Sequence, residues 1–137
     1  MKKALSLFLC AILLLSLTAC GGKKSKEPAD LTGQWKQSNS GSKDSYMTAT
    51  ISGDTIEIYW TSETDDSKSL YWAGTFTAPT TADEPYVWTS ENDHSKTDTA
   101  LLASMNDTKE FTYQKGAISY SASALGTTTT VKLEKVK

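Results

Sequence analysis

The chain has 137 residues and a formal net charge of −2, and 38% of its residues are hydrophobic. This length fits one domain that buries a hydrophobic core of its own, so a second domain is not expected. Every basic residue other than His94 is a lysine, and acidic residues outnumber the lysines. Because arginine makes the best contacts with phosphates and base edges, this composition argues against nucleic acid as a partner.

The first twenty residues have the pattern of an export signal. Lys2 and Lys3 form a basic start, residues 4–17 are mostly apolar, and small residues precede Cys20. This order is typical of a signal peptide that is cleaved during export. The apolar segment is shorter than the ~20 residues that a transmembrane helix needs. A cleaved signal is therefore favoured over an uncleaved membrane span.

The run Leu17-Thr18-Ala19-Cys20 resembles the lipobox of bacterial lipoprotein precursors. The resemblance implies cleavage before Cys20, a diacylglyceryl group on its thiol and, often, an acylated N-terminus. Two or three acyl chains provide the multiple anchoring signals that stable membrane attachment requires. We therefore expect a protein anchored by Cys20 to the extracytoplasmic face of the cell membrane. The absence of arginine and of disulfides favours a Gram-positive host.

Cleavage would divide the chain into three parts: a signal peptide (1–19), the lipidated cysteine with a flexible tether (20–30), and a single domain (31–137). Residues 21–29 combine glycine, proline and charge without an apolar period, as flexible tethers do. Cys10 leaves with the signal and Cys20 carries lipid, so the mature chain is expected to have no disulfide. Loss of the two leader lysines leaves twelve lysines and sixteen acidic residues, a net charge of −4.

From residue 31 onward, short alternating runs rich in Thr, Ser, Tyr and Trp predict an all-β domain. The predicted strands are 33–37, 46–52, 55–61, 69–78, 86–90, 100–105, 110–114, 117–123 and 128–135. Residues 99–104 have a short helix as their alternative, capped by Asp98 or Thr99. A strand about every ten residues, with short connections, predicts a small up-and-down antiparallel β-barrel of about eight strands. A β-sandwich is the alternative.

Side-chain alternation assigns the faces of the two strands at 55–61 and 69–78, because successive strand residues point to opposite sides. Ile56, Ile58 and Trp60 are predicted to face inward. Trp72 is predicted to face inward too and to meet Trp60 across the hairpin, with Tyr71 on the outer face. The predicted barrel core contains Trp35, Trp60 and Trp72.

Gly33 and Trp35 open the first strand with a G-x-W pattern that resembles the start of the calycins, the group of lipocalins, avidins and fatty-acid-binding proteins. The resemblance implies a calycin-like barrel in which Trp35 plugs one end, and it implies a small apolar ligand inside. Lipocalins usually pack an arginine over that tryptophan. This chain has no arginine, so Lys132 or Lys135 would have to take that place.

Candidate catalytic and metal-binding residues are few. His94 is the only histidine, and no nucleophile elbow or second zinc ligand accompanies it. The acidic loops at 63–66 and 91–98 offer oxygen ligands for Ca²⁺ but lack the EF-hand pattern. We therefore expect no enzymatic activity, no catalytic residue, no metal and no cofactor.

Aromatic residues outside the predicted core are the remaining candidates for binding. Tyr59, Tyr71 and Trp88 are predicted to form an exposed binding face, because such side chains bury much area with few rotatable bonds. The alternative is that they pack against the tether or neighbouring loops. We therefore expect a monomeric, non-enzymatic lipoprotein that binds a protein or cell-envelope partner, as in phage exclusion or hydrolase inhibition. A lipocalin-like carrier of a small apolar ligand is the alternative, and an envelope enzyme is the third.

Overall fold

A computed structural model describes residues 26–124 and 126–137 of the chain. The predicted signal peptide and Cys20 lie outside the described residues, as does most of the predicted tether. The described chain forms eight strands and one short helix. They are β1 (Gly33–Gln37), β2 (Ser45–Ser52), β3 (Thr55–Ser62), β4 (Ser67–Thr75), β5 (Tyr86–Glu91), α1 (His94–Thr97), β6 (Thr108–Gln114), β7 (Ala117–Ala124) and β8 (Thr127–Lys135).

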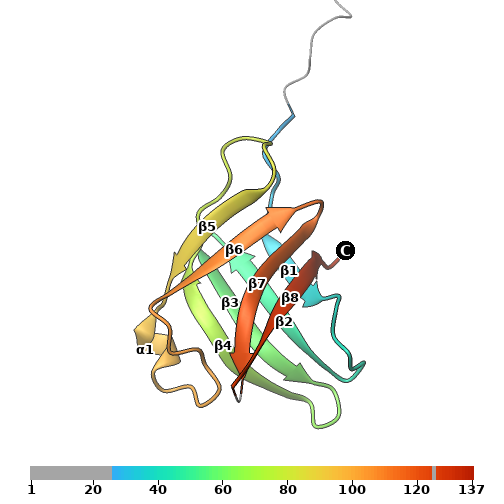
Figure 1. The fold of residues 1–137 in the computed structure, drawn as a ribbon, viewed down its shortest axis with the longest axis vertical. Helices are drawn as coiled ribbons and strands as arrows, with labels where there is room; N and C mark the ends of the chain where they lie inside the picture. The colour runs from blue at the N-terminus through green and yellow to red at the C-terminus, as the bar shows by residue number, and fades with distance from the viewer. Residues whose placement is uncertain (1–25, 125) are drawn as a thin grey trace, which may run out of the picture.

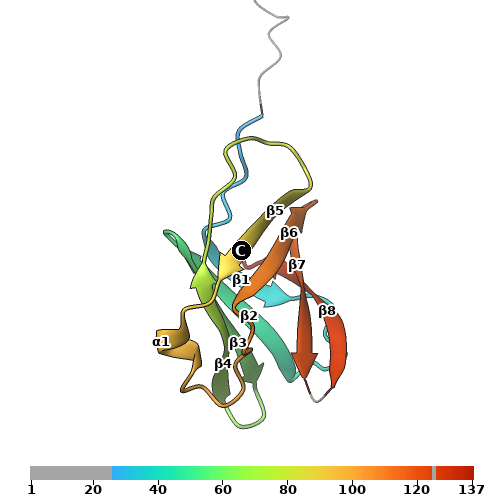
Figure 2. The same cartoon turned by 60° about the vertical axis from the view of Figure 1, so that its left-hand side comes forward.

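The strands form one antiparallel sheet in the order β4-β3-β2-β1-β8-β7-β6-β5. Each strand pairs with its neighbours in sequence except at the β4–β5 junction, and β1 also pairs with β8, so the sheet curls into a nearly closed barrel (Figures 1 and 2). The predicted all-β, up-and-down antiparallel barrel is therefore confirmed, and the sandwich alternative is wrong. The described residues contain no cysteine, so no disulfide links these strands.

The barrel closes at a seam between β4 and β5, where the ladder of hydrogen bonds is reduced to one bridge, Gly74 to Asn92. The Trp72 indole Nε1 donates to the Ser90 hydroxyl across this seam at 3.0 Å. A Cβ atom on Gly74 would lie 2.4 Å from Ser90 Oγ and 2.5 Å from the Glu91 carbonyl oxygen. Only glycine lets the two edge strands approach this closely.

Large side chains fill the interior of the barrel. The Trp88 and Phe111 rings stack with centroids 5.0 Å apart, and Tyr120 continues the cluster toward Tyr71, with centroids 6.3 Å apart. The Tyr120 hydroxyl donates to the Met47 sulfur at 3.2 Å. The middle of the barrel is therefore a packed core.

One end of the barrel is sealed where the described N-terminal residues enter. Leu31 is buried there, and its carbonyl oxygen accepts a hydrogen bond from the Trp35 indole Nε1 at 2.9 Å. The Lys135 side chain passes close to Gly33 and donates from Nζ to the Asp30 carbonyl oxygen at 2.8 Å. We call this the closed end. Residues 26–30 have no regular secondary structure.

Residues 100–105 form neither the predicted strand nor the alternative helix, so both predictions are wrong. The helix α1 comes earlier because Asp93, rather than Asp98, caps it by accepting a hydrogen bond from the Ser95 backbone N–H. The apolar side chains that suggested a strand are exposed: Leu101 is 97% and Met105 73% accessible. The remaining strands, β4 apart, match their predicted bounds within two residues.

A β-bulge in β4 changes which of its residues face inward. Ile58 pairs with Trp72, but the next residue of β3, Tyr59, pairs with Leu70, so Tyr71 has no partner opposite it. A bulge places two residues of one strand against one of the other. Tyr71 and Trp72 are consequently both buried. Trp60 packs edge-on against Tyr71, with centroids 5.4 Å apart, so the predicted contact between Trp60 and Trp72 is replaced.

Candidate functional site

A pocket of about 540 Å³ opens at the end of the barrel opposite the closed end. We call this end the mouth. The connections β1–β2, β3–β4 and β7–β8 surround it, together with the segment between α1 and β6 (Figures 1 and 2). The mouth pocket is lined by Gln37, Asn39, Ser40, Gly41, Ser45, Tyr46, Trp60, Thr61, Ser62, Ser67, Ser69, Leu102, Thr129 and Thr130.

Most residues that line the mouth pocket carry a hydroxyl or amide group, because the inward-facing positions change character along each strand. In β3 the inward positions from the closed end to the mouth are Ile56, Ile58, Trp60 and Ser62. Directly opposed residues of an antiparallel pair share a face, so the partners of Ser62 lie at the mouth too. These partners are hydroxyl residues, Ser45 on β2 and Ser67 on β4. The inner face thus turns from apolar to hydroxyl-bearing beyond Trp60.

Trp60 forms the floor of the mouth pocket, between the core and the hydroxyl groups. Its ring packs against the buried cluster through Tyr71, and its indole Nε1 donates to the Leu102 carbonyl oxygen at 3.4 Å. Trp60 is half-buried, so part of the ring faces the pocket. Its orientation is therefore set before any ligand arrives.

Two side-chain amides on one wall of the mouth pocket are also held in place. The side-chain Oε1 of Gln37 accepts from the Met47 backbone N–H at 3.0 Å, and the Nε2 of Gln37 donates to Asn39 Oδ1 at 3.1 Å. Asn39 Nδ2 donates to the Thr130 carbonyl oxygen at 2.8 Å. The pocket lining within the described parts of the chain includes no charged side chain.

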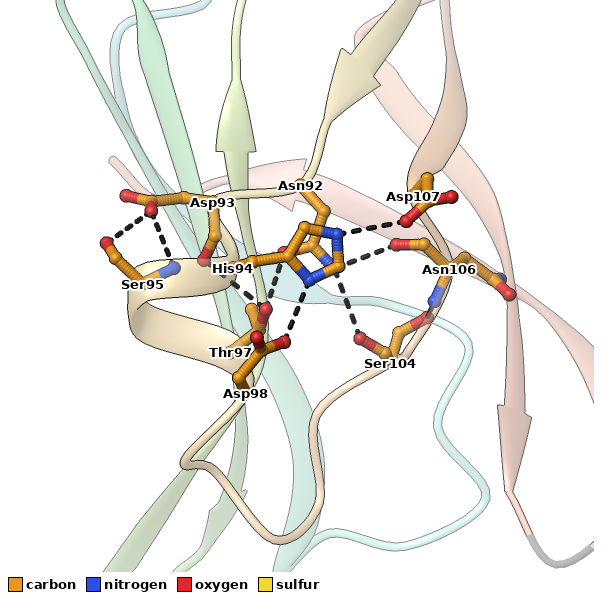
Figure 3. Close-up of polar contacts among 9 residues, drawn as sticks. All are labelled: Asn92, Asp93, His94, Ser95, Thr97, Asp98, Ser104, Asn106 and Asp107. Atoms are coloured by element: carbon orange, nitrogen blue, oxygen red, sulfur yellow. Dashed lines mark hydrogen bonds and ion pairs between the residues drawn. The ribbon is translucent and has the colours of Figure 1, made fainter.

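His94 lies outside the mouth pocket and joins the two ends of the segment that carries Leu102 (Figure 3). Its Nδ1 lies 2.8 Å from Asp98 Oδ1, and its Nε2 lies 3.0 Å from Asp107 Oδ1. The hydrogen bond with Asp98, followed by that with Asp107, raises the pKa of His94 above its ordinary value of 6.5. Both nitrogens can donate only when the ring is protonated, so the arrangement favours an imidazolium. We call residues 98–107 the strap.

Asn92 fixes the strap to the barrel beside His94 (Figure 3). Its Nδ2 donates to the Asn106 carbonyl oxygen at 2.8 Å, and its Oδ1 accepts from the Thr97 hydroxyl at 2.6 Å. The Ser104 backbone N–H donates to the Tyr71 carbonyl oxygen at 2.8 Å. Together with the two carboxylates on the His94 ring nitrogens, these contacts hold the strap against the barrel. His94 therefore has a structural role in this arrangement.

Lys109 is a buried lysine beside the seam, and it was not among the residues predicted to be functional. It is 8% accessible, and its Nζ donates to the Ser121 carbonyl oxygen at 3.0 Å. The ammonium lies 5.2 Å from the ring centroid of Tyr71 and 5.3 Å from that of Trp72. Burial lowers the pKa of Lys109. Its position as the inward neighbour of Phe111 could have been found from alternation alone.

The three predicted binding residues do not form one surface. Tyr71 is 2% and Trp88 is 4% accessible, so the expectation that they are exposed is wrong. The bulge turns Tyr71 inward, and Trp88 pairs with buried Phe111 across β5 and β6. Tyr59 does lie on the outer face, half-buried, and its hydroxyl donates to Glu57 at 2.8 Å.

The Glu57 carboxylate links Tyr59 to α1, because it also pairs with Lys96 at 2.7 Å. The hydrogen bond from Lys96, followed by that from Tyr59, lowers the pKa of Glu57. Of the residues predicted to form the barrel core, Trp35 and Trp72 are buried in it, and Trp60 is partly buried and packs against the core cluster through Tyr71. Cys20 lies outside the described residues.

Neither the acidic loops nor any other part of residues 26–124 and 126–137 brings three or more His, Cys, Asp or Glu side chains together as metal ligands. In the same residues, no helix has the length and apolar character to cross a membrane. A comparison of the chain with protein-family models, curated proteins and solved structures finds no match. The function must therefore be inferred from the residues of the site.

Proposed function

We propose that this protein is a non-enzymatic binding lipoprotein of the bacterial cell envelope, anchored through a lipid on Cys20. Its mouth pocket would meet the ligand. The observation that carries the proposal is the position of that pocket, at the end of the barrel opposite the one where residues 26–32 enter. A lipid attached before these residues would hold the closed end toward the bilayer. The mouth would then face away from the membrane.

The chemistry of the interior supports binding of a polar ligand over carriage of an apolar one. Aromatic side chains fill the middle of the barrel, and the mouth pocket is lined mostly by hydroxyl and amide groups. An apolar ligand would leave such groups without partners, at a cost of about 1–3 kcal/mol for each group. A lipocalin-like apolar carrier is therefore less well supported.

The anchoring part of the proposal is tested by replacing Cys20 with Ala and fractionating cells. We expect the wild-type protein in the membrane fraction, processed and exposed to added protease. The variant should accumulate as an unprocessed precursor or leave the membrane fraction. A Cys10→Ala variant, which changes the other cysteine of the chain, is the control and should behave as wild type. Identical processing and retention of the Cys20 variant would contradict lipid anchoring.

The binding part is tested with a charge placed in the mouth pocket. A Ser62→Lys variant puts an ammonium among the inward-facing hydroxyls of the mouth. The control, Ser52→Lys, puts an ammonium at an exposed position at the end of β2 that lies away from the mouth. Immobilised wild-type and Ser52→Lys proteins should retain the same envelope material, and Ser62→Lys should not retain it. If all three proteins retain the same material, the mouth pocket is not the binding site.

A further inference from the structure

We propose that the mouth pocket binds a neutral saccharide, with the ring of Trp60 as the surface on which one sugar ring stacks. This inference rests on the proposed binding function and names its ligand class. It follows from the lack of charge in the pocket, from its hydrogen-bonding groups and from the half-exposed indole.

The lining of the mouth pocket selects against a charged ligand. Although 22% of the residues of the chain are charged, none of the described residues that line this pocket is among them. Two charged side chains outside the lining are engaged by Tyr46: its hydroxyl donates to Glu63 at 2.6 Å, and the Lys36 ammonium lies over its ring. A phosphate, carboxylate or ammonium ligand would find no oppositely charged side chain among the residues that line this pocket.

The hydrogen-bonding groups fit a ligand that carries many hydroxyls. Serine and threonine hydroxyls both donate and accept, and side-chain amides offer one donor group and one acceptor group. Sugars present the same mixture on their ring edges. The inward-facing hydroxyls come from four strands: Ser45 on β2, Ser62 on β3, Ser69 on β4 and Thr129 on β8. They surround the space above Trp60, so they can reach the edges of a ring placed there.

The indole of Trp60 provides the apolar part of the recognition. The C–H groups on one face of a sugar ring form a flat apolar patch, which packs well against an aromatic face. Tyr71 and the Leu102 carbonyl oxygen already fix the Trp60 ring, so binding costs little side-chain ordering. The pocket volume of about 540 Å³ lies within the usual range for small-ligand sites and accommodates a disaccharide.

The test is a titration of the lipidated full-length protein, purified in a detergent without a sugar headgroup. The probes are three neutral disaccharides, cellobiose, maltose and N,N′-diacetylchitobiose. Trp60 is the one tryptophan in the pocket lining, because Trp35, Trp72 and Trp88 are buried elsewhere. We expect a change in tryptophan fluorescence and a calorimetric signal for at least one probe, with a dissociation constant between about 10 µM and 1 mM.

Adjacent residues of β3 provide a matched pair of variants. Trp60→Ala should weaken binding by about tenfold or more, because it removes the stacking surface. Tyr59→Ala truncates the neighbouring aromatic residue on the outer face and should bind as wild type. Ser69→Gln fills the pocket without removing a packed side chain, so it tests the site even if Trp60→Ala does not fold. We expect Ser69→Gln to weaken binding by about tenfold as well.

Two further probes define the chemistry. The uronic acid counterpart of the bound disaccharide should bind at least about tenfold more weakly, and octanol should give no saturable signal. The inference is overturned if no neutral disaccharide binds at concentrations up to about 10 mM. It is also overturned if Ser69→Gln binds with wild-type affinity. If saccharide binding fails while the Ser62→Lys and Ser52→Lys proteins still differ in retaining envelope material, the binding function stands with another polar ligand.

Discussion

Gly74 shows how one missing side chain controls the closure of the barrel. The nearest atoms to a Cβ at this position would be Ser90 Oγ, the Glu91 carbonyl oxygen and the Trp72 indole Nε1, all closer than 3.0 Å. One of these atoms belongs to the backbone, which cannot turn away as the end of a flexible side chain can. The position therefore requires glycine for its lack of volume.

We predict that Gly74→Ala lowers the free energy of unfolding by about 1–3 kcal/mol, as overpacking of a well-packed site does. Gly41→Ala is the control, because a Cβ there meets nothing within 4 Å. Urea denaturation of the two variants measures the effect. Equal stabilities of Gly74→Ala and the wild type would show that the seam can widen at no cost.

Lys109 is predicted to give the stability of the protein a distinct dependence on pH. Burial lowers the pKa of Lys109 in the folded state below its ordinary value of 10.5. Between the lowered pKa of the folded state and the pKa of 10.5 in the unfolded chain, the unfolded chain binds more protons than the folded chain. The free energy of unfolding therefore rises as the pH rises through this range. Lys109→Met should abolish this rise without lowering stability at neutral pH, because an apolar side chain replaces a buried charge.

Chemical denaturation of the wild type and of Lys109→Met at several pH values from neutral to about 10 measures the difference. Lys115→Met, at an exposed turn, controls for the loss of one lysine. A wild-type stability that changes with pH in parallel with that of Lys109→Met would contradict the prediction.

At the scale of elements, the strap is held closed by a titratable group. The folded pKa of His94 lies above 6.5, because its hydrogen bonds with Asp98 and Asp107 favour the charged ring. Because the pKa of His94 is raised in the folded state, the protonated ring stabilises the closed strap, and this contribution is fully present below pH 6.5. This contribution is lost as the pH rises through the folded pKa. The strap carries Leu102, whose carbonyl oxygen accepts a hydrogen bond from Trp60. Opening of the strap would therefore release this contact with the floor of the mouth pocket.

We predict that amide hydrogen exchange in residues 98–107, corrected for its intrinsic pH dependence, becomes faster as the pH rises above the folded pKa of His94. His94→Gln should exchange at the faster rate at every pH. The amides of β1, which pairs with β2 and β8, serve as the internal reference. Strap protection that stays constant across this pH range would contradict the prediction.

Two segments show where the sequence was sufficient to predict the secondary structure and where it was not. In β3 the period-two pattern predicted the bounds to within one residue and the inward face correctly, because every inward position before the mouth is apolar. At 100–105 an apolar run predicted a strand, yet its side chains are exposed and its backbone is held by the contacts of Asn92 and Tyr71. The bulge at Tyr71 could not be predicted, because it depends on pairing between strands.

At the scale of the whole molecule, the mouth pocket was missed because it exists only after the barrel has closed. Ser45, Ser62 and Thr129 are far apart in the chain, and each taken alone is an ordinary hydroxyl near the end of a strand. Continuing the alternation from Trp60 to Ser62 would have found one of them. The ring they form depends on the pairing of β1 with β8, which brings the first and last strands together.

The reduced pairing at the seam predicts an uneven stability around the barrel. Strands β4 and β5 share one bridge, whereas β7 and β8 pair along eight residues. Native-state hydrogen exchange should therefore be fastest for amides of β5 that face β4, and slowest in β2 and β8. Trp72→Phe removes the donor to Ser90 and should speed exchange in β5 more than in β8. Uniform protection of all strands would contradict a weak seam.

The chain enters and leaves the barrel at the same end, since the Val136 backbone N–H donates to the Gln34 carbonyl oxygen beside the entry of β1. Strand β8 spans nine residues. At 3.2–3.4 Å per residue and a tilt of 35–45°, its far end stands roughly 20–25 Å above the closed end. If a lipid on Cys20 anchors the chain as proposed, the barrel would act as a spacer that holds its rim of serine and threonine above the lipid headgroups. A tag fused after β8 would then lie beneath the barrel and leave that rim uncovered.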